Sequence, residues 1–142
     1  MLRHNWQRLR KWFRVALVRK RSDIRLSRFI FTEGHFSRTK KAVKHRAFLP
    51  PGDGRLSVFD TEGVDEQEIW SIGGELAVQR TQTLYARADI GTGIVISKKL
   101  RVVVDEPPPR HRNIIGWPPA TQKEDRMLIA MELAAASVLQ LP

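Results

Sequence analysis

Apolar side chains recur at helical spacing along the first 21 residues of this chain, which has 142 residues in all. Arginines line the flank of the same helical face, so the pattern predicts a basic amphipathic helix over residues 1–22. The apolar face holds Leu2, Trp6, Leu9, Phe13, Ala16 and Leu17, and the flank holds Arg3, Arg10, Arg14 and Arg21. Ser22-Asp23 breaks the pattern, and we expect residues 23–142 to form one core domain.

A second helix is predicted to begin near Asp65, because Glu68 follows at the spacing of a capping box. Its inner stripe would comprise Ile69, Ile72, Leu76 and Ala77. Gly73-Gly74 interrupts this helix and weakens it by roughly 1 kcal/mol per glycine. Such a pair suits a kink or the close approach of another backbone.

A third helix is predicted near the C-terminus, with Thr121 and Glu124 as its capping box. Its stripe at helical spacing comprises Met127, Leu128, Met131, Ala135 and Val138, and Leu139 widens it. Three small residues, 134–136, would let the helix pack closely on a sheet or on another helix. We expect this helix to pack on the sheet.

The remaining apolar runs predict strands. Residues 26–31 and 55–60 read as an antiparallel pair, 83–90 as a further strand and 100–104 as a buried strand, whereas 92–98 suits a short helix or a strand. Residues 105–119 contain five prolines and predict a surface loop. Together these elements predict an α+β fold with a mainly antiparallel sheet.

Positive charge is concentrated in the first third of the chain. Residues 1–46 hold fifteen Lys and Arg against two acids, a net charge of +13, whereas residues 47–142 hold ten against thirteen, a net of −3. Such asymmetry is typical of a surface for a polyanion, namely nucleic acid, an anionic membrane or an acidic protein. The alternative is a solvated basic face that only keeps the protein soluble.

Composition also bears on compartment and cofactors. The chain has no cysteine, which excludes disulfides, thiolate metal sites and cysteine nucleophiles and fits the cytoplasm. The apolar run 15–18 is too short for a signal peptide or a membrane span, although the acid-free, Arg-rich start also suits a mitochondrial presequence. The four histidines lack metal-ligand spacing and no phosphate-binding glycine loop is present, so we expect no metal or cofactor.

One candidate catalytic cluster is His35, Ser37 and Arg38. Neighbouring cations, Arg38 and Lys40, should lower the pKa of His35, which could then serve as a general base with Ser37 as a nucleophile and Arg38 as a phosphate clamp. His111 could join His35 as a paired acid and base. The alternative is a basic phosphate-binding loop in which the histidine is incidental.

A second candidate cluster lies in the proline-rich segment. Arg110 and Arg112 could bind a phosphate backbone, Asn113 could donate to a base edge, and Trp117 could stack on an unpaired base. Alternatively, Trp117 pins the loop to the core together with two isoleucines.

These patterns favour a small basic nucleic-acid-binding protein, a subunit of a larger nucleoprotein assembly, over an enzyme. The residues expected to contact nucleic acid are Arg10, Arg14, Arg38, Lys40, Lys41, Lys44, Arg46, Arg110, Arg112 and Trp117. One alternative is a phosphate-directed enzyme acting on RNA or a nucleotide through His35 and Arg38. Another is an interaction subunit whose N-terminal helix binds a protein groove or, less readily, a membrane surface.

Overall fold

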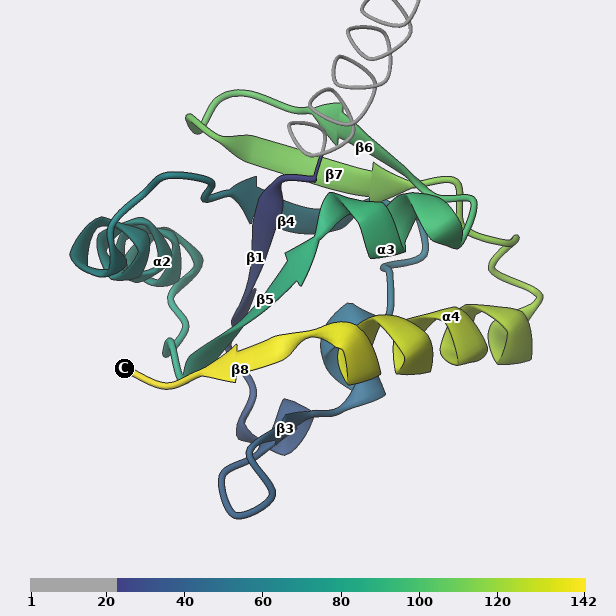
Figure 1. Cartoon of the computed structure of the whole chain (residues 1–142), viewed down its shortest axis with the longest axis horizontal. Coiled ribbons are helices and arrows are strands. Elements are labelled where there is room, and N and C mark those ends of the chain that lie inside the picture. Colours follow the sequence, from purple (N-terminus) through teal and green to yellow (C-terminus); the bar gives the residue numbers. More distant parts are fainter. Residues whose placement is uncertain (1–22) are drawn as a thin grey trace, which may run out of the picture.

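The computed structural model describes residues 23–142, so the expected N-terminal helix, with Arg10 and Arg14, lies outside the described residues. Six antiparallel strands form the central sheet (Figure 1): β1 Arg25–Ile30, β4 Leu56–Asp60, β5 Ala86–Gly91, β6 Arg101–Val104, β7 His111–Ile115 and β8 Val138–Gln140. They lie in the order β6-β7-β4-β1-β5-β8. The expected antiparallel pairing of the first two long strands is confirmed, since Ser27 of β1 lies opposite Phe59 of β4.

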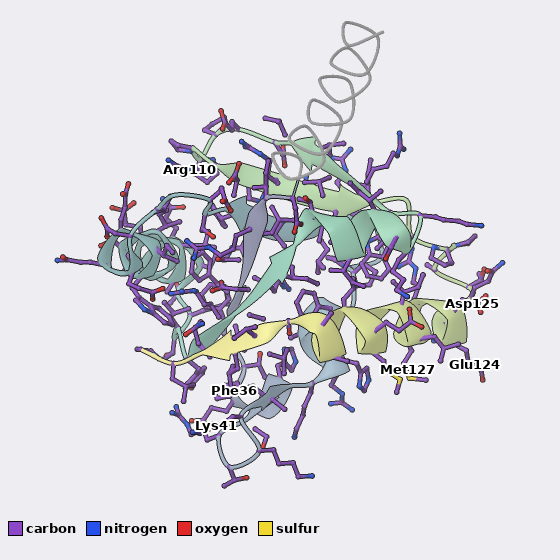
Figure 2. All side chains as sticks on the ribbon, in the orientation of Figure 1. Phe36, Lys41, Arg110, Glu124, Asp125 and Met127 are labelled. Atoms are coloured by element: carbon purple, nitrogen blue, oxygen red, sulfur yellow. The ribbon has the colours of Figure 1, made fainter. Side chains whose placement is uncertain are left out.

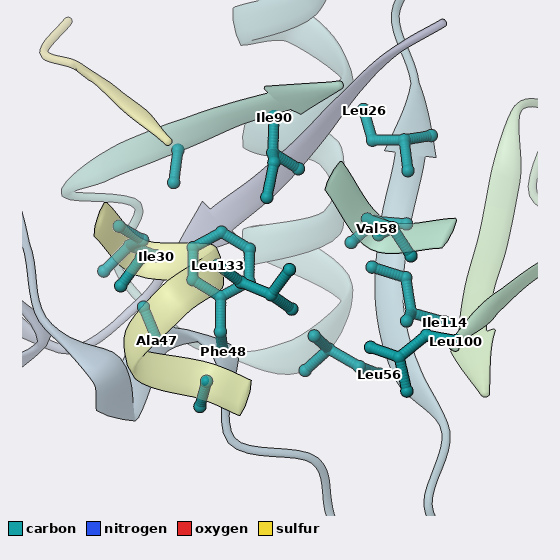
Figure 3. Close-up of a cluster of buried hydrophobic side chains, with 14 of the residues drawn as sticks. Leu26, Ile30, Ala47, Phe48, Leu56, Val58, Ile90, Leu100, Ile114 and Leu133 are labelled. Atoms are coloured by element: carbon teal, nitrogen blue, oxygen red, sulfur yellow. The ribbon is translucent and has the colours of Figure 1, made fainter. Parts of the chain in front are cut away.

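One face of the sheet carries the larger apolar core. Strand alternation directs Leu26 and Ile30 of β1, Val58 of β4 and Ile114 of β7 to this face, where all are buried. It is covered by α3 Thr92–Ser97, α4 Lys123–Ala136 and the short 3₁₀ helix η2 His45–Phe48. Figure 3 shows the ring of Phe48 beside Leu133 at the centre of this cluster. The α+β architecture with a C-terminal helix packed on the core is therefore confirmed.

Helix α2, Glu66–Arg80, covers the opposite face. It begins as expected, because the carboxylate of Asp65 accepts a hydrogen bond of 2.8 Å from the backbone N–H of Glu68. A smaller apolar cluster lies beneath it and comprises Phe29, Phe59, Val64, Ile69 and Leu76. The sheet is thus the middle of three layers.

At Gly73, helix α2 packs closely on side chains of the sheet and of the segment before β5. A Cβ atom at this position would lie 2.6 Å from the ring of Phe29 and 2.9 Å from Leu84, whereas a Cβ at Gly74 would meet nothing within 4 Å. A side chain is therefore the close neighbour, not the second backbone that the sequence suggested. The two adjacent glycines have different physical roles.

Alanine at these two positions should change stability in opposite directions. We expect Gly73→Ala to lower the free energy of unfolding by about 1–2 kcal/mol, because overpacking outweighs the gain in helix propensity. Gly74→Ala should raise it by about 0.5–1 kcal/mol through propensity alone. Urea denaturation of both variants measures the two signs, and a stabilising Gly73→Ala would contradict the close packing.

A small hairpin projects from the body of the molecule (Figure 1). The chain leaves β1 through the 3₁₀ helix η1 Glu33–His35, forms β2 Phe36–Ser37 and β3 Ala42–Val43, and enters η2. Within residues 23–142, no helix is long and apolar enough to cross a membrane.

Two expectations for the strands need correction. Residues 111–115 form β7 and not a loop, because their backbone pairs with β4 on one side and with β6 on the other. Strand β6 is not buried, since it lies at the edge of the sheet and both its first and last residues are exposed. Its run of valines reflects strand propensity more than burial. The ambiguous segment 92–98 forms helix α3.

The C-terminal helix also differs from its expected form. Helix α4 begins after Gln122, whose side chain makes no capping bond, so the Thr121–Glu124 capping box is wrong. The stripe expected to pack inward is largely exposed: Met127 at 37%, Leu128 at 56% and Met131 at 48%. Ala130, Leu133 and Ala134 are buried instead. Small alanines allow the helix to approach η2 closely, which the bulky methionines would prevent.

Candidate nucleic-acid interface and a serine-histidine pair

The projecting segment 36–46, here called the basic hairpin, is built from two short strands and a tight turn. Phe36 lies opposite Val43, and Ser37 lies opposite Ala42. The Oγ of Ser37 accepts a 3.2 Å hydrogen bond from the backbone N–H of Lys40, and Lys41 has a left-handed backbone with φ of 50°. Lys41 is the last residue of this turn and is exposed on the projecting hairpin (Figure 2).

The basic hairpin carries five exposed cations: Arg38, Lys40, Lys41, Lys44 and Arg46. In the described part of the chain none of them forms an ion pair; the ion pairs of Lys and Arg found there involve Arg87, Lys98 and Arg112. Arg38 instead lies over the ring of Phe36, 5.4 Å from its centroid. Five like charges within nine residues repel one another unless an anion binds between them.

A groove of about 410 Å³ separates the hairpin from α4. Its lining includes the cations Lys44 and Arg46 beside His45, and the apolar residues Val43, Met131, Ala134 and Ala135. The exposed Met127 and Leu128 lie on the same helix. The groove therefore combines positive charge with apolar surface.

His35 lies at the base of the hairpin, next to Arg28 and Arg46. Its pKa is lowered first by burial and then by the charges of Arg28, Arg46 and His45, which are not the cations that the sequence suggested. Among the described contacts none joins His35 to Ser37, whose hydroxyl faces the turn. The expected nucleophile and base are thus not brought together.

The structure also separates His35 from His111. His35 ends η1 beside the hairpin, whereas His111 begins β7, and these two parts lie at opposite ends of the molecule (Figure 1). No acid-base pair can form between the two histidines in this structure.

The residues of the second expected cluster, in the proline-rich segment, are largely used in contacts within the protein. Arg112 pairs with Glu106 at 3.0 Å and with Asp60 at 3.8 Å, and Arg110 lies on the far side of the molecule from the hairpin (Figure 2). Trp117 is 9% exposed and its indole N–H donates to the carbonyl of Ile114 at 3.0 Å. The indole therefore holds the chain against the core, which is the alternative that the sequence left open. Removing so large an apolar ring from water is more favourable than leaving it exposed for stacking.

A polar pair that the sequence analysis missed lies where β4 meets β7. The Oγ of Ser57 and the Nε2 of His111 are 2.7 Å apart, although 54 residues separate them. His111 Nδ1 lies 2.8 Å from the carbonyl oxygen of Asp105 and 3.5 Å from its carboxylate. This pair depends on the pairing of β4 with β7, which the sequence did not predict because residues 111–115 were expected to form a loop.

Comparisons with known proteins give no further guide. No family model, curated protein or solved structure matches this chain. The geometry of the described residues therefore carries the functional argument.

The polar network between β1, β5 and α2 is structural. The guanidinium of Arg87, which is fully buried, binds Asp89 at 3.0 Å and Glu66 at 2.7 Å, and stacks 4.8 Å from the ring centroid of Trp70. Ser27 donates to Asp89 at 2.7 Å. Among residues 23–142, every buried side-chain polar atom has a partner, and no group of three or more His, Asp or Glu could hold a metal ion.

Proposed function

We propose that this protein binds nucleic acid through the basic hairpin and the groove beside it. The observation that carries the proposal is the set of five exposed cations with no acidic partner in the described chain. Lys and Arg side chains bind phosphates, and the release of counterions from the nucleic acid supplies most of the affinity.

The groove supports the same proposal. Phosphates would bind Lys44 and Arg46, while the apolar side chains of Val43 and Met131 would contact sugars and bases. Residues 1–22 add eight further Lys and Arg and no acid, including Arg10 and Arg14. We propose further that the protein works within a larger nucleoprotein assembly, since phosphate contacts position a protein on nucleic acid without specifying a sequence.

Neutralising the hairpin should weaken binding and reduce its dependence on salt. In the full chain, we expect the combined change Lys40→Gln, Lys41→Asn and Lys44→Gln to lower affinity by about 10–100-fold at low salt. Each phosphate contact contributes a slope of about 0.7–0.9 in log affinity against log salt, so the slope should fall by roughly 2–3. Fluorescence anisotropy with labelled single-stranded and double-stranded RNA and DNA at several salt concentrations measures both quantities.

A control variant removes two exposed cations elsewhere, and the losses of the two variants are compared per charge removed. Lys99→Asn and Lys123→Gln lie outside the hairpin, and asparagine tolerates the left-handed backbone of Lys99. The control should retain most of the affinity, and the hairpin variant should lose it equally for unrelated sequences. Equal losses in the two variants, or unchanged binding in the hairpin variant, would contradict the proposed interface.

A further inference from the structure

The Ser57–His111 pair has the arrangement of a nucleophile beside its general base. The Nδ1 of His111 lies within hydrogen-bond distance of the Asp105 carbonyl, which only accepts, so the proton belongs on Nδ1. Nε2 is then the acceptor, and the Ser57 hydroxyl donates to it at 2.7 Å. This is the proton arrangement that activates a serine.

The base is itself held in place. Asn113 donates from its side-chain amide to the carboxylate of Asp105 at 2.7 Å, and the ring of His111 packs edge-on against Phe59 at 5.2 Å. Asp105 is anchored further by its backbone N–H, which donates to the carbonyl of His111 at 3.1 Å. Nucleophile, base and positioning groups therefore form one connected set, and Ser57 and His111 both keep partial exposure.

Positive charge lies on the same face of the sheet. The register pairs Arg101 with Ile115 and Val103 with Asn113, so Arg101 shares the face of Asn113 and His111. Arg55 immediately precedes β4 and is two residues from Ser57, so its Cα lies at most about 7 Å from that of Ser57. Both arginines are exposed, and in residues 23–142 neither forms an ion pair. The side chain of Arg55 is long enough to span the distance to Ser57.

We propose that Ser57 and His111 form a catalytic site that hydrolyses phosphate esters, with Arg55 and Arg101 binding the phosphate oxygens. A phosphate suits the site better than a carboxylic ester does, because backbone N–H groups within a sheet are used in the ladder and cannot form an oxyanion hole. Guanidinium groups stabilise the charge on a transferring phosphoryl group instead. This activity goes beyond nucleic-acid binding and uses none of the hairpin residues.

The reaction proceeds in two balanced steps. Ser57 Oγ attacks phosphorus while its proton passes to His111 Nε2, and the bond from phosphorus to the leaving oxygen breaks as that oxygen takes the proton from His111. A water molecule then attacks the phosphoserine and gives a proton to His111. The phosphate leaves, and the Ser57 oxygen regains its proton from His111.

The test measures hydrolysis by the full chain of p-nitrophenyl phosphate and of bis(p-nitrophenyl) phosphate, which stand for a small monoester and for the diester of a nucleic acid. We expect turnover of one of them, and the preference assigns the source of the phosphate. Ser57→Ala and His111→Asn should each lower kcat by at least about 100-fold. Asparagine keeps a donor for the Asp105 carbonyl, so this variant should remain folded by circular dichroism.

Two further variants separate catalysis from structure. Arg101→Gln should raise KM roughly tenfold with little change in kcat, and Ser97→Ala, an exposed serine whose hydroxyl donates to the carbonyl of Ile94, should retain full activity. Mass spectrometry of rapidly quenched protein should locate the phosphoryl group on Ser57. Absence of turnover of both esters by the unmodified protein, or full turnover by Ser57→Ala, would overturn the proposal while leaving nucleic-acid binding intact.

Discussion

Arg87→Ala should lower the free energy of unfolding by about 3–5 kcal/mol. The guanidinium is fully buried and forms two hydrogen bonds with Asp89, at 3.0 and 3.1 Å. Its removal leaves the Asp89 carboxylate, itself only 8% exposed, without the opposite charge that compensates its burial. Urea denaturation followed by circular dichroism, at constant m-value, measures the loss.

Glu66→Gln provides the matched control. Its side chain is 64% exposed although it binds the same guanidinium, so the loss at neutral pH should stay below about 1 kcal/mol. The hydrogen bond from Arg87 holds the pKa of Glu66 below its usual 4.5. Its contribution is therefore present above pH 4.5 and disappears as the pH falls through the lower folded-state value. Equal losses for the two variants at neutral pH would place the energy of the network in the exposed pair.

Phe48→Ala should have a loss of similar size, about 3–5 kcal/mol. The ring is completely buried between the sheet and α4, beside Leu133 (Figure 3), and alanine would leave a cavity that the surrounding helices cannot fill. Because η2 connects the hairpin to the core, this ring also anchors the proposed binding surface. Thermal denaturation monitored by near-ultraviolet circular dichroism measures the change.

Phe48→Leu distinguishes cavity formation from a general sensitivity of the segment. Leucine retains most of the apolar volume, so the loss should be limited to about 1.5 kcal/mol. A leucine variant as unstable as the alanine variant would argue that the shape of the ring, not its volume, holds η2 against α4.

Elements with strong local signals could be predicted from the sequence. The strand at residues 26–31 and the start of α2 at Asp65 depend on alternation and capping, which act within a few residues. The direction in which α4 faces could not be predicted, because two apolar stripes compete on it. The stripe that contains Ala130 and Leu133 packs inward, because the close approach of η2 leaves little space for larger side chains.

The net charge of each part of the chain could be predicted, but not which of its arginines are available at the surface. Arg25 and Arg28 were counted with the basic third, yet both are used internally. Arg25 donates to the carbonyls of Thr61 and Val64, and Arg28 to those of Ala47 and Ser57. Burial and the nearby charge of Arg80 lower the pKa of Arg28 to about 10, so it stays charged at neutral pH. Such internal use depends on which carbonyls the fold leaves unpaired.

The serine-histidine pair lay beyond sequence reasoning for a similar reason. Neither Ser57 nor Asp105 stands near His111 in a recognisable spacing, and only the register of β4 against β7 brings the hydroxyl to the imidazole. A segment with five prolines gives a strong loop signal, which obscured the alternation of residues 111–115.

The order of the strands has a consequence for how fast the chain can fold. Strand β1 pairs with β4 and β5, which both follow it in the chain. The sheet is complete only when β5 has paired with β8, where Ala88 lies opposite Leu139, and β4 with β7, where Ser57 lies opposite Asn113. Closing such long loops costs entropy before any contact compensates for it, so sheets rich in non-local pairing fold in roughly milliseconds to seconds rather than microseconds. Until β8 pairs with it, β5 presents an open edge, and during that interval the chain is most exposed to association with other copies of itself.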